Sequence, residues 1–236
     1  MYYHIWMPAK NSLKIYAPNS YYHLYNRGVE KRIIFIDEQD YQVFLSYLKE
    51  YLMPKDELAL RKRLADSNTS YKEKNKILKA LRMNNFSDVM SLVAYCLMPN
   101  HFHFLIKQKT DTAIDSFMRS LGTRYTMYFN KKYKRVGPLY QGVYKAVLVN
   151  TDEQLLQLSR YIHRNPRIIA SQGETLQGYD QPSSLFDYLG KRNTSWVHPE
   201  DILVFFSKTN PKLTYEAFIK QREYDETVKK LLIDED

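Results

Sequence analysis

The sequence has one cysteine, Cys96, so an internal disulfide is excluded. Cys96 lies inside the apolar run VAYCLM, where a buried thiol without a chemical role is the simplest interpretation. Runs of about 18 or more uncharged apolar residues are also absent, which argues against a membrane-spanning helix. The N-terminus, MYYHIWMPAK, lacks the apolar stretch and the cleavage site of a signal peptide. We therefore expect a cytoplasmic protein.

Acidic residues are the minority charge, with 26 Asp and Glu against 35 Lys and Arg, for a net charge of +9 and an isoelectric point near 9.3. The last sixteen residues are acidic overall, so the basic excess lies in the rest of the chain. A basic surface favours partners that carry phosphate. The 21 tyrosines can stack on unpaired bases, although most tyrosines in any fold serve packing. Composition alone leaves nucleic-acid binding open.

The chain is long enough, at 236 residues with 44% hydrophobic residues, to bury the core of one domain. We expect this domain at residues 20–189, between an N-terminal extension at 1–19 and a C-terminal extension at 190–236. A segment at about 55–88 is polar and rich in Lys and Arg, and it predicts a basic helical insertion within the domain.

Hydrophobic periodicity predicts strands and helices in alternation around this insertion. A proline disfavours helical geometry in the residue before it, so Pro166 is expected to end the last helix near Asn165. This order predicts an α+β fold in which an antiparallel sheet has its helices packed on one face. The expected elements are a strand at 20–27, a helix at 37–53, strands at 89–98 and 101–107, a helix at 111–133, a strand at 139–149 and a helix from 152.

Two histidines stand two residues apart in the second strand of the predicted hairpin. Side chains alternate along a strand, so His101 and His103 share one face while Phe102 and Phe104 point to the other face, toward the core. Two imidazoles on one face can converge on a divalent ion. A bare pair of this kind is more often solvated at an edge, so further ligands are needed to make a site.

The segment LSRYIHRNP supplies candidates on the last helix. Tyr161 and Asn165 are one helical turn apart and share a face at the edge of the apolar stripe. His163 lies about 160° around the helix from Tyr161, so we exclude it from the same site. Spacing alone leaves two alternatives open, a boundary tyrosine and an asparagine that caps the helix end.

Four motifs together resemble a known family. They are YHLYNRG at 22–28, MPNHFHFLI at 98–106, RYTMYFN at 124–130 and YIHRNP at 161–166. In order and spacing they resemble the IS200-like Y1 transposases of the HUH nuclease superfamily, and most of all the REP-associated tyrosine transposases. The resemblance extends over roughly residues 20–190.

This resemblance implies a ferredoxin-like sheet in an HUH-type nuclease domain. By position, His101, His103 and Asn165 would be ligands of Mg²⁺ or Mn²⁺, and Tyr161 would be the nucleophile. The implied activity is metal-dependent cleavage and rejoining of single-stranded DNA with hairpin or palindromic ends, through a covalent 5′-phosphotyrosine, as in DNA transposition. A homodimer and a nucleoid-associated location are also implied.

Basic side chains are candidates for contacts with DNA phosphates, although each can instead be a solvated charge. Two other functions remain open: a non-cutting nucleic-acid-binding regulator that keeps the transposase fold, and a metal-dependent hydrolase without a covalent step. Substitution of Tyr161 separates them from the implied activity. The candidate phosphate contacts are Arg27, Arg119, Arg124, Lys131, Lys132 and Lys145.

Overall fold

The computed structural model describes residues 14, 16–171 and 182–221, without the side chains of 166–171. Its centre is a four-stranded antiparallel sheet in the order β2-β3-β1-β4. The strands are β1 (Ser20–Arg27), β2 (Met90–Met98), β3 (His101–Gln108) and β4 (Lys145–Val149). With one helix crossing from β1 to β2 and another from β3 to β4, this is the ferredoxin-like arrangement, and the predicted fold class is confirmed.

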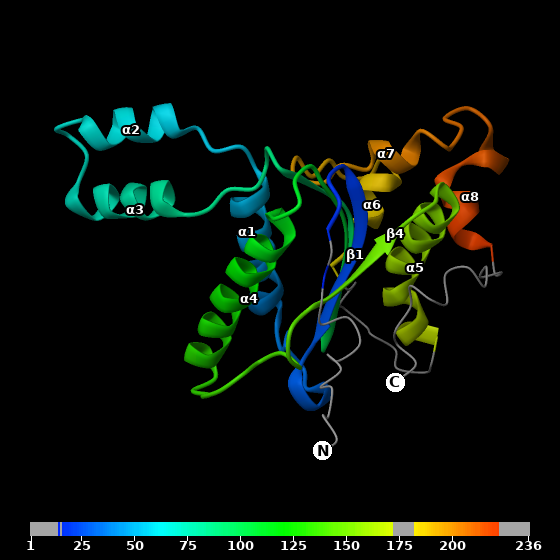
Figure 1. The fold of residues 1–236 in the computed structure, drawn as a ribbon, viewed down its shortest axis with the longest axis horizontal. Helices are drawn as coiled ribbons and strands as arrows, with labels where there is room; N and C mark the ends of the chain where they lie inside the picture. The colour runs from blue at the N-terminus through cyan, green and yellow to red at the C-terminus, as the bar shows by residue number, and fades with distance from the viewer. Residues whose placement is uncertain (1–13, 15, 172–181, 222–236) are drawn as a thin grey trace, which may run out of the picture.

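Helices cover both faces of the sheet (Figure 1). The two crossover helices, α1 (Glu38–Leu52) and α4 (Ala113–Lys132), pack on one face, and the prediction that the helices lie on one face only is wrong. The other face is covered by α5 (Asp152–Ser171) with the short helices α6 (Leu185–Tyr188), α7 (Glu200–Leu203) and α8 (Tyr215–Lys220). No helix among the described residues is long and apolar enough to span a membrane. Single 3₁₀ turns, η1 and η2, occur at Val29–Lys31 and Pro211–Leu213.

Strand alternation divides the buried side chains between two core layers. Leu24 and Phe104 belong to the layer under α1 and α4, while Leu105 and Val149 belong to the layer under α5. The same alternation places β3 side chains with odd numbers, including both candidate histidines, toward α5. A helix therefore lies directly over the face on which a site was predicted.

The helices α1 and α4 are joined at one end by a polar cluster. Asp37 and Asp40 form a capping box at the start of α1. Asp40 is fully buried, and its carboxylate accepts hydrogen bonds from Lys132 at 2.7 Å and from Tyr133 at 2.7 Å. A buried carboxylate with this many partners is satisfied, so the cluster fixes the end of α4 against the start of α1.

Two helices, α2 (Glu57–Ala65) and α3 (Tyr71–Arg82), form an arm within the segment 55–88. They pack mainly against each other and extend away from the sheet (Figure 1). Side chains of Asp56 and Ser70 cap their first turns by accepting backbone N–H groups. The segment therefore adds a projecting surface without interrupting the sheet.

Residues 182–221 cover the outer edge of β2. The carbonyl of Pro182 accepts from the Leu97 N–H at 2.9 Å, and the His198 N–H donates to the Leu92 carbonyl at 2.8 Å. Trp196 stacks on Tyr95 with 5.6 Å between ring centres. An edge strand with unpaired backbone groups is a liability, and this segment pairs many of them.

The predicted strand at 139–149 is wrong over its first half. Tyr140 forms an isolated bridge with Gly28, and the regular strand begins only at Lys145. Between them Gly142 has a φ of 74°, a left-handed conformation that a strand does not contain and that glycine adopts readily. The residues 140–144 are therefore a loop leading into β4.

The expected end of the last helix at Asn165 is also wrong, because α5 continues to Ser171. A proline removes one backbone hydrogen bond and restricts the residue before it, and those are local penalties. Tertiary packing routinely overrides local propensity, and α5 packs against β2 and β3.

Candidate active site

The candidate histidines lie on β3 opposite charged and aromatic residues of β1. His101 is paired in register with Arg27, and His103 with Tyr25. Their imidazole rings are 5.0 Å apart, between ring centres, at an angle of 87°. On the other side of β1, Lys145 is paired with Tyr25, so it belongs to the same sheet face. The strands thus bring two imidazoles and two cations to one surface.

Helix α5 places Tyr161 over this surface. Its ring meets that of His103 edge-on, with 5.4 Å between ring centres, and that of His23 at 6.4 Å. Tyr161 is 6% exposed and His103 is 1% exposed. The helix is fixed there by Leu158 and Ile162, both fully buried in the layer between α5 and the sheet. Tyr161 and the histidine pair, distant in sequence, are therefore neighbours in the fold.

Asn100 determines which nitrogen of His101 carries the proton. The Asn100 amide nitrogen donates to the Lys31 carbonyl at 3.3 Å, which leaves Oδ1 facing the His101 Nδ1 at 2.6 Å. An amide oxygen only accepts, so Nδ1 of His101 is the donor and Nε2 keeps its lone pair. Burial, with a smaller contribution from Arg27, lowers the pKa of His101 to about 4. The ring is therefore neutral at pH 7, as a metal ligand must be.

His23 was missed by reasoning from the sequence, and it contacts His103 directly. Its Nε2 is 2.9 Å from Nδ1 of His103, and the two rings stack with 5.1 Å between their centres. His23 is fully buried. In the aromatic stretch SYYHLYNR it resembles a packing residue, and only its alternation with Tyr25 and Arg27 on β1 indicates that it shares their face.

The bond between His23 and His103 contains one shared proton. If Nδ1 of His103 donates, its Nε2 keeps a lone pair that can bind a cation; if His23 donates, that Nε2 carries a proton and cannot. Burial lowers the pKa of His103 well below its ordinary value, with further contributions from His23 and His101. A neutral His103 is thus oriented by a second imidazole, the arrangement that fixes metal-binding histidines in proteins.

The residues present fit a divalent cation. Within the described residues there is no cluster of three or more His, Cys, Asp or Glu arranged for a metal, so the candidate set is two imidazoles and an amide. Nε2 of His101 and Nδ2 of Asn165 are buried and have no hydrogen-bond partner in the described part of the chain. Rotation of the Asn165 amide would put Oδ1, a suitable oxygen ligand, in that place. Buried polar atoms of this kind favour a bound ligand.

His163 has a structural role on another side of α5. Its Nδ1 is 2.7 Å from the Tyr215 hydroxyl, and its Nε2 is 2.7 Å from the Ser184 hydroxyl. Burial lowers the pKa of His163 to about 3. The exclusion of His163 from the candidate site agrees with these contacts, which attach α5 to the C-terminal segment.

Acid is expected to destabilise the fold through His163. Between its folded pKa of about 3 and the unfolded value of 6.5, the unfolded chain binds one more proton, so the free energy of unfolding falls as pH falls below 6.5. Between pH 7 and pH 5 the His163→Asn variant should lose about 2 kcal/mol less than the parent in urea unfolding. Both proteins keep their other histidines, so the difference isolates this one, and equal losses would contradict the assignment.

Two of the six candidate phosphate contacts lie on the histidine face. Arg27 donates through Nε to the Gln141 side-chain oxygen at 2.6 Å, and Lys145 lies on the neighbouring strand. Both are partly exposed. They are placed to neutralise phosphates that approach Tyr161, and this role stays a prediction.

The other four candidate cations lie on α4, across the sheet from the histidines. Arg124 pairs with Glu50 at 2.7 Å, and Lys132 pairs with the Asp37–Asp40 cluster. These ion pairs give both residues a role within the fold. Arg119 and Lys131 are exposed. DNA contact by all four stays a prediction.

Comparisons with known proteins agree with the family resemblance. Residues 60–165 match a family described as "Transposase IS200 like", and the match includes His101, His103, Tyr161 and Asn165. The predicted likeness to IS200-like transposases is confirmed, and it supports transposase-type processing of DNA by an enzyme. A solved structure described as "Structure of the REP associates tyrosine transposase bound to a REP hairpin" is 12% identical, with a TM-score of 0.47, covering 80% of this chain and 97% of that chain. No curated protein matches.

Proposed function

We propose that this chain, similar to IS200-like transposases over residues 60–165, cleaves and rejoins single-stranded DNA with Tyr161 as nucleophile. The observation that carries the proposal is the edge-on contact of Tyr161 with His103, which places a hydroxyl-bearing ring beside a buried imidazole. A boundary tyrosine on a solvated surface would not need such a partner. The repeat-associated branch that the motifs resemble indicates hairpin or palindromic DNA as the substrate, and a homodimer as the working form.

The proposed reaction exchanges one phosphodiester for another. The Tyr161 oxygen bonds to the scissile phosphorus as the bond to the 3′ oxygen breaks, giving a 5′-phosphotyrosine and a free 3′-hydroxyl. The phenolic proton leaves Tyr161, and the departing 3′ oxygen takes up a proton. Attack by a 3′-hydroxyl on the phosphotyrosine reverses the step, so rejoining needs no ATP. The burial of Tyr161 and His103 keeps water from competing with that hydroxyl.

Each remaining residue has a defined task in this proposal. His101 and His103 would hold a divalent ion, Mg²⁺ or Mn²⁺, through Nε2, and Asn165 would hold it through Oδ1. When bound, such an ion withdraws charge from the phosphate oxygens. Arg27 and Lys145 attract the flanking phosphates electrostatically. Formation of a denaturation-stable adduct between the protein and a single-stranded hairpin oligonucleotide tests the proposal directly.

His23 positions His103 in this scheme. Replacing His23 with alanine removes the acceptor that keeps the proton on Nδ1 of His103, and Mn²⁺ affinity is expected to fall by about 10- to 100-fold. Glutamine at the same position offers an oxygen acceptor and should restore part of the loss. Mn²⁺ titration followed by electron paramagnetic resonance measures this without any cleavage.

His198 is a matched control for His23, because its side chain is partly exposed and its one hydrogen bond among the described residues is to Glu200. Its alanine variant should bind Mn²⁺ like the parent. An unchanged affinity in the His23→Ala protein, or no difference between the alanine and glutamine variants, would show that His23 serves packing alone.

A further inference from the structure

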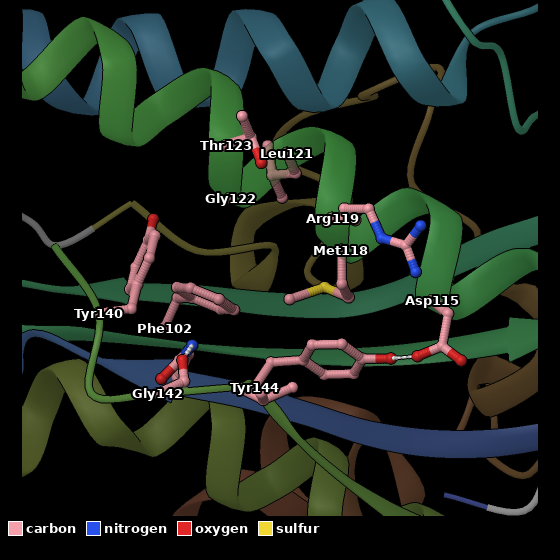
Figure 2. A pocket seen from close by; sticks show the side chains of 12 residues that line it. Phe102, Asp115, Met118, Arg119, Leu121, Gly122, Thr123, Tyr140, Gly142 and Tyr144 are labelled. Carbon is pink, nitrogen blue, oxygen red and sulfur yellow. Dashed lines mark hydrogen bonds between the residues drawn. The ribbon is translucent and has the colours of Figure 1, made fainter. Parts of the chain in front are cut away.

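A cavity of about 380 Å³ lies on the sheet face opposite the histidines, between α4 and the loop 140–144 (Figure 2). Aromatic rings of Phe102, Tyr140 and Tyr144 line it from below, and Asp115 and Arg119 reach toward it from α4. This is a concave site with aromatic walls and a few polar groups, the usual composition of a pocket for a planar ligand.

The two charged side chains of the cavity are held apart. Asp115 and Arg119 are one helical turn apart on α4, a spacing that permits an ion pair, yet none joins them in the described structure. The Asp115 carboxylate instead accepts a hydrogen bond from the Tyr144 hydroxyl, which is 2.6 Å from the hydroxyl of Tyr16. This hydrogen bond, made to one of its two oxygens, orients the Asp115 carboxylate. Among the described residues, the Arg119 guanidinium has no hydrogen-bond or ion-pair partner, and it is exposed.

A buried hydroxyl in the cavity wall also lacks a partner. The Tyr140 hydroxyl is inaccessible to solvent and makes no hydrogen bond within the described part of the chain. Burial raises the pKa of Tyr140, so the hydroxyl remains protonated and able to donate. Gly122 of α4 faces the Tyr140 ring, and a Cβ added to this glycine would lie 3.9 Å from the ring. At this point α4 therefore contributes no side chain to the cavity wall. A small movement of the Tyr140 ring would be needed to open this hydroxyl to a ligand, which would then supply the partner that it lacks.

The polar groups match one nucleobase best. Guanine presents two donors, N1–H and the N2 amino group, beside the acceptors O6 and N7. A carboxylate accepts from the first pair, and an arginine fork donates to the second. Adenine lacks the N1–H donor and the O6 acceptor, so it satisfies neither charged group as well. In a duplex the N1 and N2 donors are already paired, so the base must be unpaired.

The cavity and the Tyr161 site are linked by one loop. Arg27 on the histidine face donates to the side chain of Gln141. The preceding residue on β1, Asn26, faces the cavity and donates to the Gly142 carbonyl at 3.3 Å. Residues 141–143 are exposed. A single strand passing over this loop can therefore present a phosphate to Tyr161 and a base to the cavity.

We propose that the cavity binds an unpaired guanine of the DNA substrate, with Asp115 accepting from N1–H and N2–H and Arg119 donating to O6 and N7. The inference rests on the proposed function in that the substrate is single-stranded DNA. Guanine stacks against the aromatic wall, and the loop 140–144 determines its distance from the cleaved bond. Arg119 is thus a base contact and not a phosphate contact.

Binding of oligothymidylate with a single guanine, adenine or hypoxanthine, followed by fluorescence anisotropy, tests the proposal. The full chain should prefer guanine over adenine by about tenfold or more, with hypoxanthine between them because it lacks the N2 amino group. Arg119→Ala and Asp115→Asn should each remove the preference and leave binding of plain oligothymidylate nearly unchanged. Lys208→Ala and Asp88→Asn, exposed residues that match the charge changes, should keep it.

These measurements are made with the Tyr161→Phe protein in the absence of metal, so they do not depend on cleavage. Arg119 is exposed and makes no hydrogen bond or ion pair among the described residues, so its variant is expected to fold even if Asp115→Asn weakens the link to Tyr144. Equal binding of the three oligonucleotides, or a preference that survives in the Arg119→Ala protein, would overturn the guanine site. If the parent cleaves through Tyr161 but shows no preference, only this inference fails; a preference without cleavage leaves it standing while the proposed function fails.

Discussion

Replacing Tyr161 with phenylalanine is expected to lower cleavage of a single-stranded hairpin by more than about a thousandfold. The change removes only the hydroxyl, so the ring keeps its contacts with His103 and His23 and the fold keeps α5 in place. Binding of the same hairpin should be unchanged, because DNA affinity depends chiefly on cations such as Arg27 and Lys145. Loss of the reaction without loss of binding is the signature of a missing nucleophile.

End-labelled substrates give this prediction its sharpest form. A 5′-phosphotyrosine retains the DNA on the 3′ side of the cut, so a 3′ label should travel with the protein on a denaturing gel while a 5′-labelled fragment is released. Tyr71→Phe is a matched control, since Tyr71 is exposed on α3, away from the sheet. It should form the adduct like the parent.

The outcomes separate the three functions considered for this chain. Cleavage that persists in the Tyr161→Phe protein, with no adduct, would leave a metal-dependent hydrolase. Binding of the hairpin by the parent without cleavage or adduct would indicate a regulator that keeps the transposase fold. An adduct with the 5′ label would contradict the proposed polarity of the attack.

The fold was largely predictable because its elements have clear periodicity. Alternation along β3 predicts that His101 and His103 share a face, and helical spacing predicts the same for Tyr161 and Asn165. Each is a local relation between residues close in sequence. The two pairs are brought together by packing between α5 and β3, which the periodicity of neither segment contains.

The contact of His23 with His103 could not be predicted from local periodicity. Its partner, His103, lies 80 residues away, and β1 and β3 are neighbours only because the second crossover inserts β1 between β3 and β4. No local pattern distinguishes a histidine that orients another histidine from one that simply packs. Knowledge of the strand order would have been sufficient, since alternation then places His23 next to the predicted pair.

The helices within residues 182–221 could not be predicted from the sequence, for a different reason. Its helices α6 and α7 have four residues each, too short to show an amphipathic period. The segment that contains them pairs with the outer edge of β2, and α8 is attached to α5 through contacts such as that of Tyr215 with His163. Short elements held by tertiary contacts leave little signal in the sequence.

Removal of divalent metal is expected to stop cleavage, with a loss of at least about a hundredfold in EDTA and recovery on addition of Mg²⁺ or Mn²⁺. The reason is the donor set: Nε2 of His101 and Nδ2 of Asn165 are buried and have no hydrogen-bond partner in the described structure. An ion bound by these groups would neutralise charge developing on the oxygens of the cleaved phosphate, while Arg27 and Lys145 attract the flanking phosphates.

The double variant His101→Ala/His103→Ala distinguishes an ion at this site from an ion that acts on the DNA. It should lose cleavage in the presence of Mg²⁺ and lose Mn²⁺ binding in a direct titration, while hairpin binding is retained. His198→Ala changes a partly exposed histidine whose side chain hydrogen-bonds to Glu200, and it should change none of the three measurements. Full activity of the parent in EDTA would remove the metal from the mechanism. The rings of His103 and His23, which lie beside Tyr161, would then be the candidate acceptors of its proton, and His103 would act as a base instead of a ligand.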